Sequence, residues 1–157
     1  MTPTTVNIET AQCEKPLHVG CISCERELRA NTESKLTVQL TNEHRAITRD
    51  LERVKTHAAK FEANEAISLT ELTKSVNEHF DKEERFLYPL LERFLGSNIC
   101  ETLKSEHDEI ATVLMNLDRQ TSLVEEHLIH LEQLLRAHVS VEENVLFWYL
   151  NLEQPTE

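Results

Sequence analysis

HFDKEERFLYPLL, residues 79–91, decides how this chain is organised, and a weaker copy, HVSVEENVLFWYL, follows at residues 138–150. In each copy a His is followed four residues later by a Glu, and a second Glu comes next: His79 and Glu83, then His138 and Glu142. On a helix, four residues span about 400° of turn and roughly 6 Å of rise, so each His stacks on its Glu. A Glu on an apolar face is costly unless a partner neutralises it, and a metal ion would do so.

Both His-Glu pairs lie on predicted apolar faces. The stripe through His79 contains Leu72, Val76, Leu87 and Leu90, and the stripe through His138 contains Leu131, Leu135, Val145 and Tyr149. Spacing by threes and fours is typical of a helix that buries one side. We therefore expect these apolar side chains to pack in the core beside the His-Glu pairs.

The composition favours one helical domain and excludes several functions. The 157 residues suffice for one core and include only two Gly and four Pro, which leaves little material for turns between strands. The formal net charge of -12 lacks the basic footprint that nucleic acids and anionic membranes attract, whereas it suits a cation binder. No apolar run reaches the roughly 18 residues of a membrane span, and MTPTTVNIET at the start lacks signal-peptide features. We expect a cytoplasmic protein without nucleic-acid or membrane partners.

Helical periodicity predicts four long helices joined by short links, an all-α, antiparallel up-down-up-down four-helix bundle. The expected boundaries are about Thr32 to Ala63, Ser68 to Gly96, a start at Ser97, and Ser122 to about Leu150. Ser68 and Ser122 are each followed by a Glu three residues later, a capping-box pattern. Pro89 would remove a backbone hydrogen bond and bend the second helix just past its His-Glu pair.

The helices that precede the two His-Glu pairs repeat a second pattern. A Glu-His dipeptide at residues 43–44 lies 35 residues before His79, and another at residues 106–107 lies 31 residues before His138. Each helical hairpin therefore supplies one His from its first helix and a His-Glu pair from its second. The predicted metal ligands are His44, His79, Glu83, His107, His138 and Glu142. Four imidazoles and two carboxylates at one level suit two ions bridged by both Glu, with Fe, Zn, Mn or Co all acceptable.

In this order, the six predicted ligands and the wording HFDKEERFLYPLLER resemble the hemerythrin-like (HHE cation-binding) family over about residues 36–150. The resemblance implies a non-haem centre of two oxo- or hydroxo-bridged Fe ions in a four-helix bundle. Its ligand would be O2, NO or peroxide. Oxygen-carrying members have a His-x-x-x-His pair on the third helix, whereas Ala111 stands four residues after His107 in this chain. The ion that lacks this ligand should have a further open or water-filled position.

Three functions are compatible with these observations. The leading hypothesis is a non-haem di-iron protein that binds or senses dioxygen or nitric oxide through the four-His, two-Glu centre. An alternative is a di-iron enzyme of oxidative or nitrosative stress defence, which reduces peroxide or NO or donates iron for iron-sulfur cluster repair. A third is a divalent-metal buffer without redox chemistry. The sequence assigns no protein partner.

Several polar side chains near the ligands have weaker assignments. Glu84 and Glu143 lie about 100° round the helix from the ligand Glu, so we expect them to be solvated or to hydrogen-bond the ligands. Thr48, one turn beyond His44, is expected to pack and could donate to a bound ligand. Tyr149 is a candidate for a dioxygen pocket. The remaining histidines of the helical region, His57, His127 and His130, are expected at the surface or beside the ligands.

The N-terminal extension, residues 1–31, carries a separate set of soft ligands, whereas the predicted bundle covers residues 32–151 and a polar tail covers residues 152–157. Cys13, His18, Cys21 and Cys24 follow a C-x4-H-x2-C-x2-C spacing. A tetrahedral zinc site, a redox-sensing thiol pair and a tail of reduced Cys all fit this spacing. Cys100, in the predicted first turn of a helix, is expected to have a lowered pKa.

Overall fold

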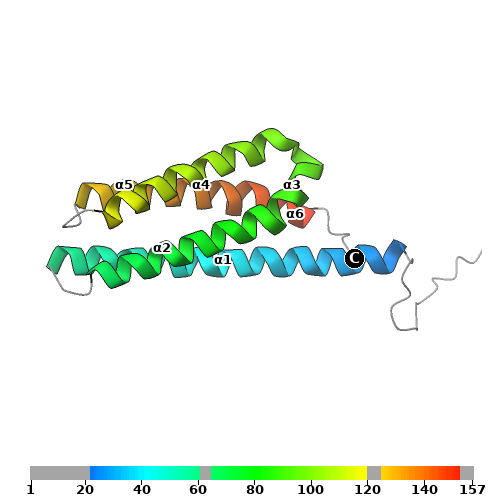
Figure 1. Cartoon of the computed structure of the whole chain (residues 1–157). Helices are drawn as coiled ribbons and strands as arrows, with labels where there is room; N and C mark the ends of the chain where they lie inside the picture. Colours follow the sequence, from blue (N-terminus) through cyan, green and yellow to red (C-terminus); the bar gives the residue numbers. More distant parts are fainter. Residues whose placement is uncertain (1–21, 61–64, 120–124, 153–157) are drawn as a thin grey trace, which may run out of the picture.

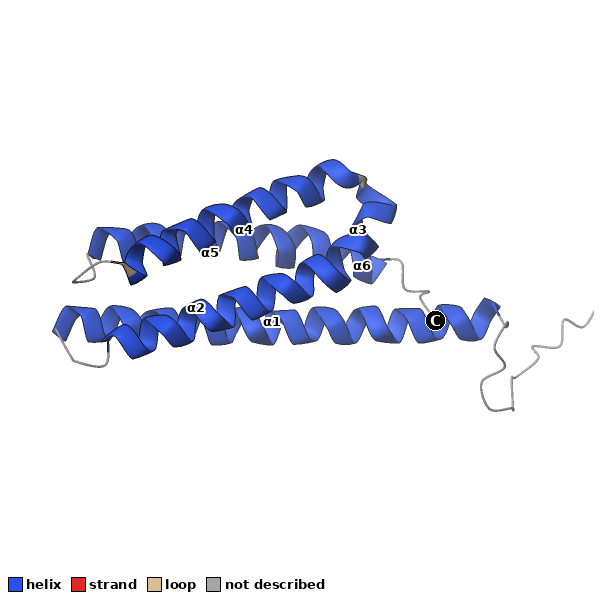
Figure 2. Ribbon diagram, in the orientation of Figure 1, coloured by secondary structure: helices blue, strands red, loops and turns tan. Residues whose placement is uncertain are grey.

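The structure, a computed structural model, describes residues 22–60, 65–119 and 125–152, and these ranges are almost entirely helical (Figures 1 and 2). No strand occurs within them. The prediction of an all-α four-helix bundle is therefore confirmed. Four helical rods run alternately up and down along a common axis (Figure 1).

The first rod is α1 (Ile22–Lys60), and the third is α4 (Ser97–Asp118). The second rod is built from three consecutive segments: α2 (Glu65–Lys82), η1 (Glu83–Leu87) and α3 (Tyr88–Leu95). The fourth repeats this construction: α5 (Glu125–Val141), η2 (Glu142–Leu146) and α6 (Phe147–Leu152). Helix α1 packs against α2 and α5, and α4 packs against the same two helices, so the rods form a closed ring in chain order.

The starts of two helices, α1 and α2, differ from the predicted boundaries. Helix α1 begins at Ile22 rather than at Thr32, because the residues before Thr32 include strong helix formers. Helix α2 begins at Glu65, so Ser68 lies inside the helix and does not cap it. Helix α4 begins at Ser97 itself, and Gly96 stands at its N-cap. The predicted cap at Ser122 lies outside the described residues.

Gly96 makes the sharp turn between the second and third rods, as the sequence predicts. Its φ of 80° lies in the left-handed region that glycine adopts without steric cost. Its backbone N–H donates to the carbonyl of Glu92 at 3.1 Å, which closes the last turn of α3. The turn sets the antiparallel course of α4 against α2.

The bundle core consists of two apolar clusters with a polar layer between them. One cluster extends from the middle of the bundle toward the α1–α2 and α4–α5 links; its members include Ile47, Leu72, Val76, Ile110, Leu114 and Leu131. The other lies toward the α3–α4 turn and includes Leu40, Leu87, Leu91, Leu103, Leu146 and Leu150. On every rod, at least one predicted His or Glu ligand falls in sequence between the members of the two clusters. The apolar layers therefore shield the polar layer from solvent at both ends.

Both composite rods contain a five-residue π-helical turn, and each begins at a predicted ligand: η1 at Glu83 and η2 at Glu142. Single π turns inside α-helices are rare and are frequent at functional sites. We expected Pro89 to interrupt the second rod. That explanation is incomplete, because the fourth rod has the same turn and no proline follows it in residues 142–152.

The π turns also correct the predicted apolar stripes. In a π turn each backbone hydrogen bond spans five residues, whereas in an α-helix it spans four. The extra residue shifts every later side chain round the helix axis. Val145 and Tyr149, predicted in the core, are exposed, whereas Leu146 and Phe147 are buried instead. In the second rod Leu90 is half-buried and Tyr88 is fully buried.

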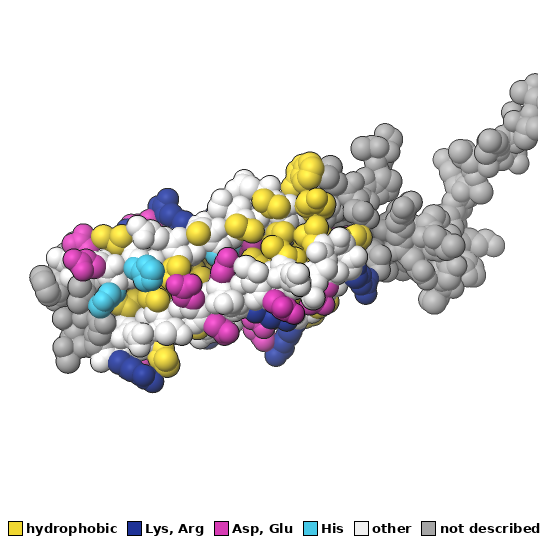
Figure 3. Space-filling model, turned by 90° about the horizontal axis from the view of Figure 1, so that it is seen from above, with side chains coloured by type: hydrophobic (Ala, Val, Ile, Leu, Met, Phe, Trp, Pro, Cys, Tyr) yellow, Lys and Arg dark blue, Asp and Glu magenta, His cyan; other side chains and the backbone are white. Residues whose placement is uncertain are grey.

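Exposed apolar side chains gather at one end of the molecule. Figure 3 shows hydrophobic groups concentrated toward the end where α3 and α6 lie, with charged groups spread along the rest of this face. The exposed large apolar residues of η1, α3, η2 and α6 are Phe86, Phe94, Val145, Trp148 and Tyr149. Within the described residues, no helix combines the length and the apolar character needed to cross a bilayer.

Candidate metal centre

The six predicted ligands meet in the polar layer at the middle of the bundle. His44 comes from α1 and His107 from α4, while each His-Glu pair spans the junction between an α-helix and the π turn that follows it. None of the six residues is more than 3% exposed. The structure thus brings together all six residues that the sequence singled out.

Glu83 lies at the centre of this layer and faces both pairs of histidines. Its Oε1 atom is 2.8 Å from Nε2 of His79 and 3.5 Å from Nε2 of His44. Its Oε2 atom is 3.2 Å from Nε2 of His107 and 3.7 Å from Nε2 of His138. One carboxylate therefore presents one oxygen to each hairpin.

Glu142 repeats this arrangement from the fourth rod. Its Oε2 atom lies 3.3 Å from Nε2 of His44, and its Oε1 atom lies 3.6 Å from Nε2 of His138. Glu83 and Glu142 are thus placed as two carboxylates shared between two histidine pairs. The ligand atoms form two groups, each with its atoms within 4.8 Å of one another: His44, His79, Glu83 and Glu142, and Glu83, His107 and His138.

The donor atoms of this layer fit metal ions better than they fit one another. Six buried atoms of the layer have no hydrogen-bond partner of good geometry among the described residues: Nε2 of His44, Nε2 of His79 and both oxygens of Glu83 and of Glu142. Unpartnered buried polar atoms cost free energy, and bound metal cations would satisfy them. Imidazole nitrogens and carboxylate oxygens are ligands that Fe, Zn and Mn accept. The residues therefore fit a metal centre.

The outward nitrogen of every ligand histidine contacts a carboxylate. The four contacts are His44 Nδ1 to Glu143 at 2.7 Å, His79 Nδ1 to Glu43 at 3.1 Å, His107 Nδ1 to Glu84 at 3.0 Å and His138 Nδ1 to Glu106 at 2.9 Å. A carboxylate accepts, so each Nδ1 donates, and Nε2 is the ring nitrogen that faces the centre and would bind a metal. Each carboxylate comes from the rod that precedes its histidine, with the fourth rod serving the first. The contacts close a ring around the bundle.

Two of these four carboxylates, Glu43 and Glu106, were missed by the sequence analysis. Glu84 and Glu143 were expected to be solvated or to bond the ligands, and they do bond them. Glu43 and Glu106 received no role, although each stands directly before a ligand histidine. The repeated Glu-His dipeptide was the available signal.

The buried charges shift one another's protonation. Burial would lower the pKa of His44, but its contacts with Glu142, Glu83 and Glu143 outweigh burial and raise it to about 10. Burial likewise opposes the rise of the His138 pKa to about 9, which contacts with Glu83 and Glu142 produce. Burial would raise the pKa of Glu83, yet the four surrounding histidines hold it well below its ordinary value. For Glu142, burial and the charge of Glu83 raise the pKa to about 6.

Aromatic rings pack against the histidines and make the two halves unequal. Phe80 stacks on His107 with ring centroids 3.7 Å apart, and Phe147 lies parallel to His44 at 6.0 Å. Tyr88 occupies, five residues after Glu83, the position that Phe147 occupies after Glu142. Its hydroxyl lies 2.8 Å from Nε2 of His107, and burial with the charges of Glu142 and Glu83 raises its pKa far above the ordinary value. A phenol therefore stands beside the His107–His138 pair alone.

Other predicted residues lie away from the centre. Ala111 is half-buried one turn from His107 and offers no ligand atom. Thr48 donates its hydroxyl to the backbone carbonyl of His44 at 2.9 Å. His127 and His130 are exposed, and His57 is half-buried. Tyr149 is 43% exposed, so the structure does not support its placement in a dioxygen pocket.

The cysteine predictions have separate outcomes. Cys13, His18 and Cys21 lie outside the described residues; Cys24 lies in α1, but its side chain is not described. The expected lowering of the Cys100 pKa is wrong, because burial raises it. The buried Cys100 thiol donates to the carbonyl oxygen of Tyr88 at 3.6 Å.

Comparison with known proteins agrees with this geometry. Residues 35–150 match the model of a family described as Hemerythrin HHE cation binding domain. No curated protein and no solved structure matches the chain. The matched range contains the complete His and Glu layer and begins after the Cys-containing segment.

Proposed function

The chain belongs to the hemerythrin HHE cation-binding family, and on that premise we propose that it holds two iron ions and binds or senses dioxygen or nitric oxide. His44 and His79 would hold one ion, His107 and His138 would hold the other, and Glu83 and Glu142 would bridge them. When bound, two adjacent redox-active ions would supply electrons to a diatomic ligand. A cytoplasmic location is part of the proposal.

One observation carries this proposal: each of two carboxylates turns one oxygen toward each of two histidine pairs. A single ion at one histidine pair would leave buried and unsatisfied the carboxylate oxygens that face the other pair. Two ions satisfy both. The ring of outer carboxylates supports the same assignment, since it fixes the tautomer that metal binding requires.

The protein supplies an enclosed setting for the ligand. The apolar clusters on either side exclude bulk water, which would otherwise compete for open positions and protonate a reduced ligand. Each histidine pair holds two imidazoles, so both positions keep room for an external ligand. The small number of imidazole ligands at each position supports, as the second candidate, an enzyme that reduces peroxide or NO.

Metal content and optical spectra test the proposal. Protein purified without added metal is expected to contain about two irons per chain by elemental analysis, and additional zinc would support a site in the Cys-containing segment. Air exposure of the reduced protein should give a stable charge-transfer band for a carrier or sensor. Immediate oxidation with peroxide turnover would support the enzyme instead, and a colourless zinc- or manganese-loaded protein would support a metal buffer.

A pair of variants checks the ligand assignment. His79→Ala is expected to lose one iron and change the spectrum, because Nε2 of His79 faces the centre. His57→Ala, on the same bundle but away from the polar layer, is expected to keep both irons. Equal iron content in the two variants would refute the assignment.

A further inference from the structure

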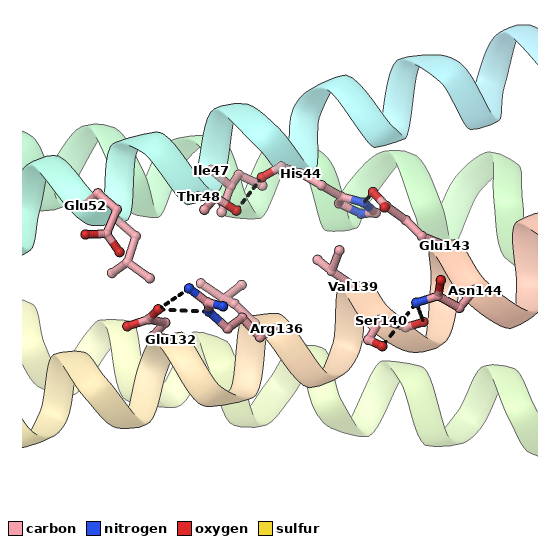
Figure 4. Close-up of a pocket in the computed structure, with 12 residues that line it drawn as sticks. His44, Ile47, Thr48, Glu52, Glu132, Arg136, Val139, Ser140, Glu143 and Asn144 are labelled. Carbon is pink, nitrogen blue, oxygen red and sulfur yellow. Dashed lines mark hydrogen bonds and ion pairs between the residues drawn. The ribbon is translucent and has the colours of Figure 1, made fainter.

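A cavity of about 260 Å³ leads to one side of the metal centre but not to the other. It lies between α1 and the α5–η2 segment, and its lining residues come from these two rods only. Figure 4 shows His44 and Glu143 at one end of it and Glu52 and Glu132 toward the other. His44, a proposed ligand of the first ion, is therefore one of the residues that line the cavity.

The internal duplication shows why this cavity is open. Aligning His79 with His138 places Val139 at the position of Phe80. Phe80 stacks on His107 with an interplanar angle of 9°, so its ring covers the imidazole that corresponds to His44. Val139 is smaller, and it lines the cavity beside His44 without covering it.

The equivalent surface of the other half also carries a depression, but this depression does not reach the histidines of the polar layer. A depression between α2 and α4 is lined by residues that include Asn77, Glu78, Ala111 and Leu114. Neither His107 nor Phe80 is among its lining residues. The two grooves thus share a position in the duplicated fold, and only the groove between α1 and α5 extends to a histidine.

The lining of the open groove indicates what passes through it. Ile47, Leu51, Leu135 and Val139 give it apolar walls, and Thr48, Ser140 and Asn144 add uncharged polar groups. Its charged lining residues are Glu52, Glu132, Arg136 and Glu143. Glu132 at the outer part is held by Lys55 at 2.7 Å and by Arg136 at 2.7 Å. Glu143 is held by His44. Such a lining favours a small uncharged molecule over an anion.

We propose that the groove between α1 and α5 is the route by which an uncharged diatomic ligand reaches the ion at His44 and His79, and that Val139 keeps it open. The proposal rests on the proposed function, since it names the route to that same centre. It makes the ion at His107 and His138, covered by Phe80, the less accessible of the two.

Xenon tests the groove independently of the metal. Crystals of the full chain under xenon pressure are expected to hold xenon against the apolar wall formed by Ile47, Leu51, Leu135 and Val139, because xenon binds to apolar cavity surfaces. Val139→Phe should abolish this xenon site. Ala137→Phe is the matched control, since Ala137 is exposed on the same helix and does not line the groove. A wild-type protein without xenon in this groove would overturn the proposal.

The rate of NO binding tests the route itself. In stopped-flow experiments on the reduced, iron-loaded protein, Val139→Phe should slow NO association by roughly tenfold, because the ring must move before the ligand passes. Ala137→Phe should bind at the wild-type rate, and the final spectrum should be the same in all three proteins. Val139→Leu, a smaller change for the fold, should give an intermediate rate.

Two outcomes separate the route from the function. If the wild-type protein binds NO and Val139→Phe binds it equally fast while excluding xenon, the route is refuted and the proposed function stands. If iron-loaded wild-type protein binds neither NO nor O2, the proposed function is refuted and the route falls with it, whatever the xenon experiment shows.

Discussion

Glu43 accepts a hydrogen bond from Nδ1 of His79 at 3.1 Å, which directs Nε2 of that imidazole toward Glu83. Glu43 is itself held by Lys82, whose ammonium lies 2.7 Å from its other oxygen. Burial would raise the pKa of Glu43, but hydrogen bonds from Lys82, Gln39 and His79 lower it. The carboxylate is therefore ionised and fixed before any metal arrives.

Glu43→Ala should weaken the first ion. Loss of the partner of a metal-bound histidine typically costs about 10- to 100-fold in metal affinity, and we expect a loss in this range. Competition with a coloured chelator would measure it. Glu78→Ala is the matched control. Glu78 lies next to His79 on α2, but its side chain is exposed and forms a loose ion pair with Lys74, with 3.8 Å between the charged atoms. Equal affinities in the two variants would contradict the role assigned to Glu43.

Glu83→Ala should remove metal from both positions. Its two oxygens face different histidine pairs, so the substitution deletes one ligand from each proposed ion. We expect clearly less than one iron per chain by elemental analysis at saturating iron. Glu84→Ala, which removes only a partner of His107, should keep both ions under the same conditions. Retention of two irons by Glu83→Ala would show that the carboxylate does not bridge.

Metal affinity should rise with pH. In the metal-free protein His44 and His138 have pKa values of about 10 and 9, so at neutral pH each ion must displace one proton. Calorimetry in buffers of different ionisation enthalpy should detect release of about one proton per ion. A metal affinity that is constant between pH 6 and about 8 would contradict these assignments.

The stability of the metal-free protein should change in the opposite direction. Both histidines have raised pKa values, so their stabilising contribution is complete below the ordinary value of 6.5 and is lost as pH rises through about 9 to 10. Denaturant titrations of protein kept in chelator should therefore show the free energy of unfolding falling between pH 7 and about 10. A free energy that stays level over this range would be inconsistent with protonated histidines in the core.

Tyr88→Phe should cost about 1 kcal/mol of unfolding free energy, because it removes a buried hydrogen bond between the phenol and His107. The ring itself should still fit, since Phe147 already fills the corresponding position in the other half. Tyr149→Phe is the matched control on an exposed ring and should stay within about 0.5 kcal/mol of wild type. Urea unfolding of both variants would measure the difference.

Periodicity predicted the bundle and the face of each helix, because apolar spacing records which side of a helix is buried. Periodicity could not predict the π turns, because a shift of one residue in helix register leaves no trace in the residue composition. This shift moved Val145 and Tyr149 to the surface. The internal duplication identified His44 and His107 as ligands, although neither has another predicted ligand close to it in the sequence. Glu43 was overlooked because spacing along one helix does not reveal which group on the next helix lies opposite.

The closed circuit of carboxylates and imidazoles has a mechanical consequence. Every rod both holds a histidine of the next rod and has its own histidine held by the rod before it. A sideways slip of any one rod would therefore disturb two neighbours and both shared carboxylates together. Loading of the first ion should align the second position, so that the two ions enter cooperatively and the cross-section of the molecule stiffens in one step.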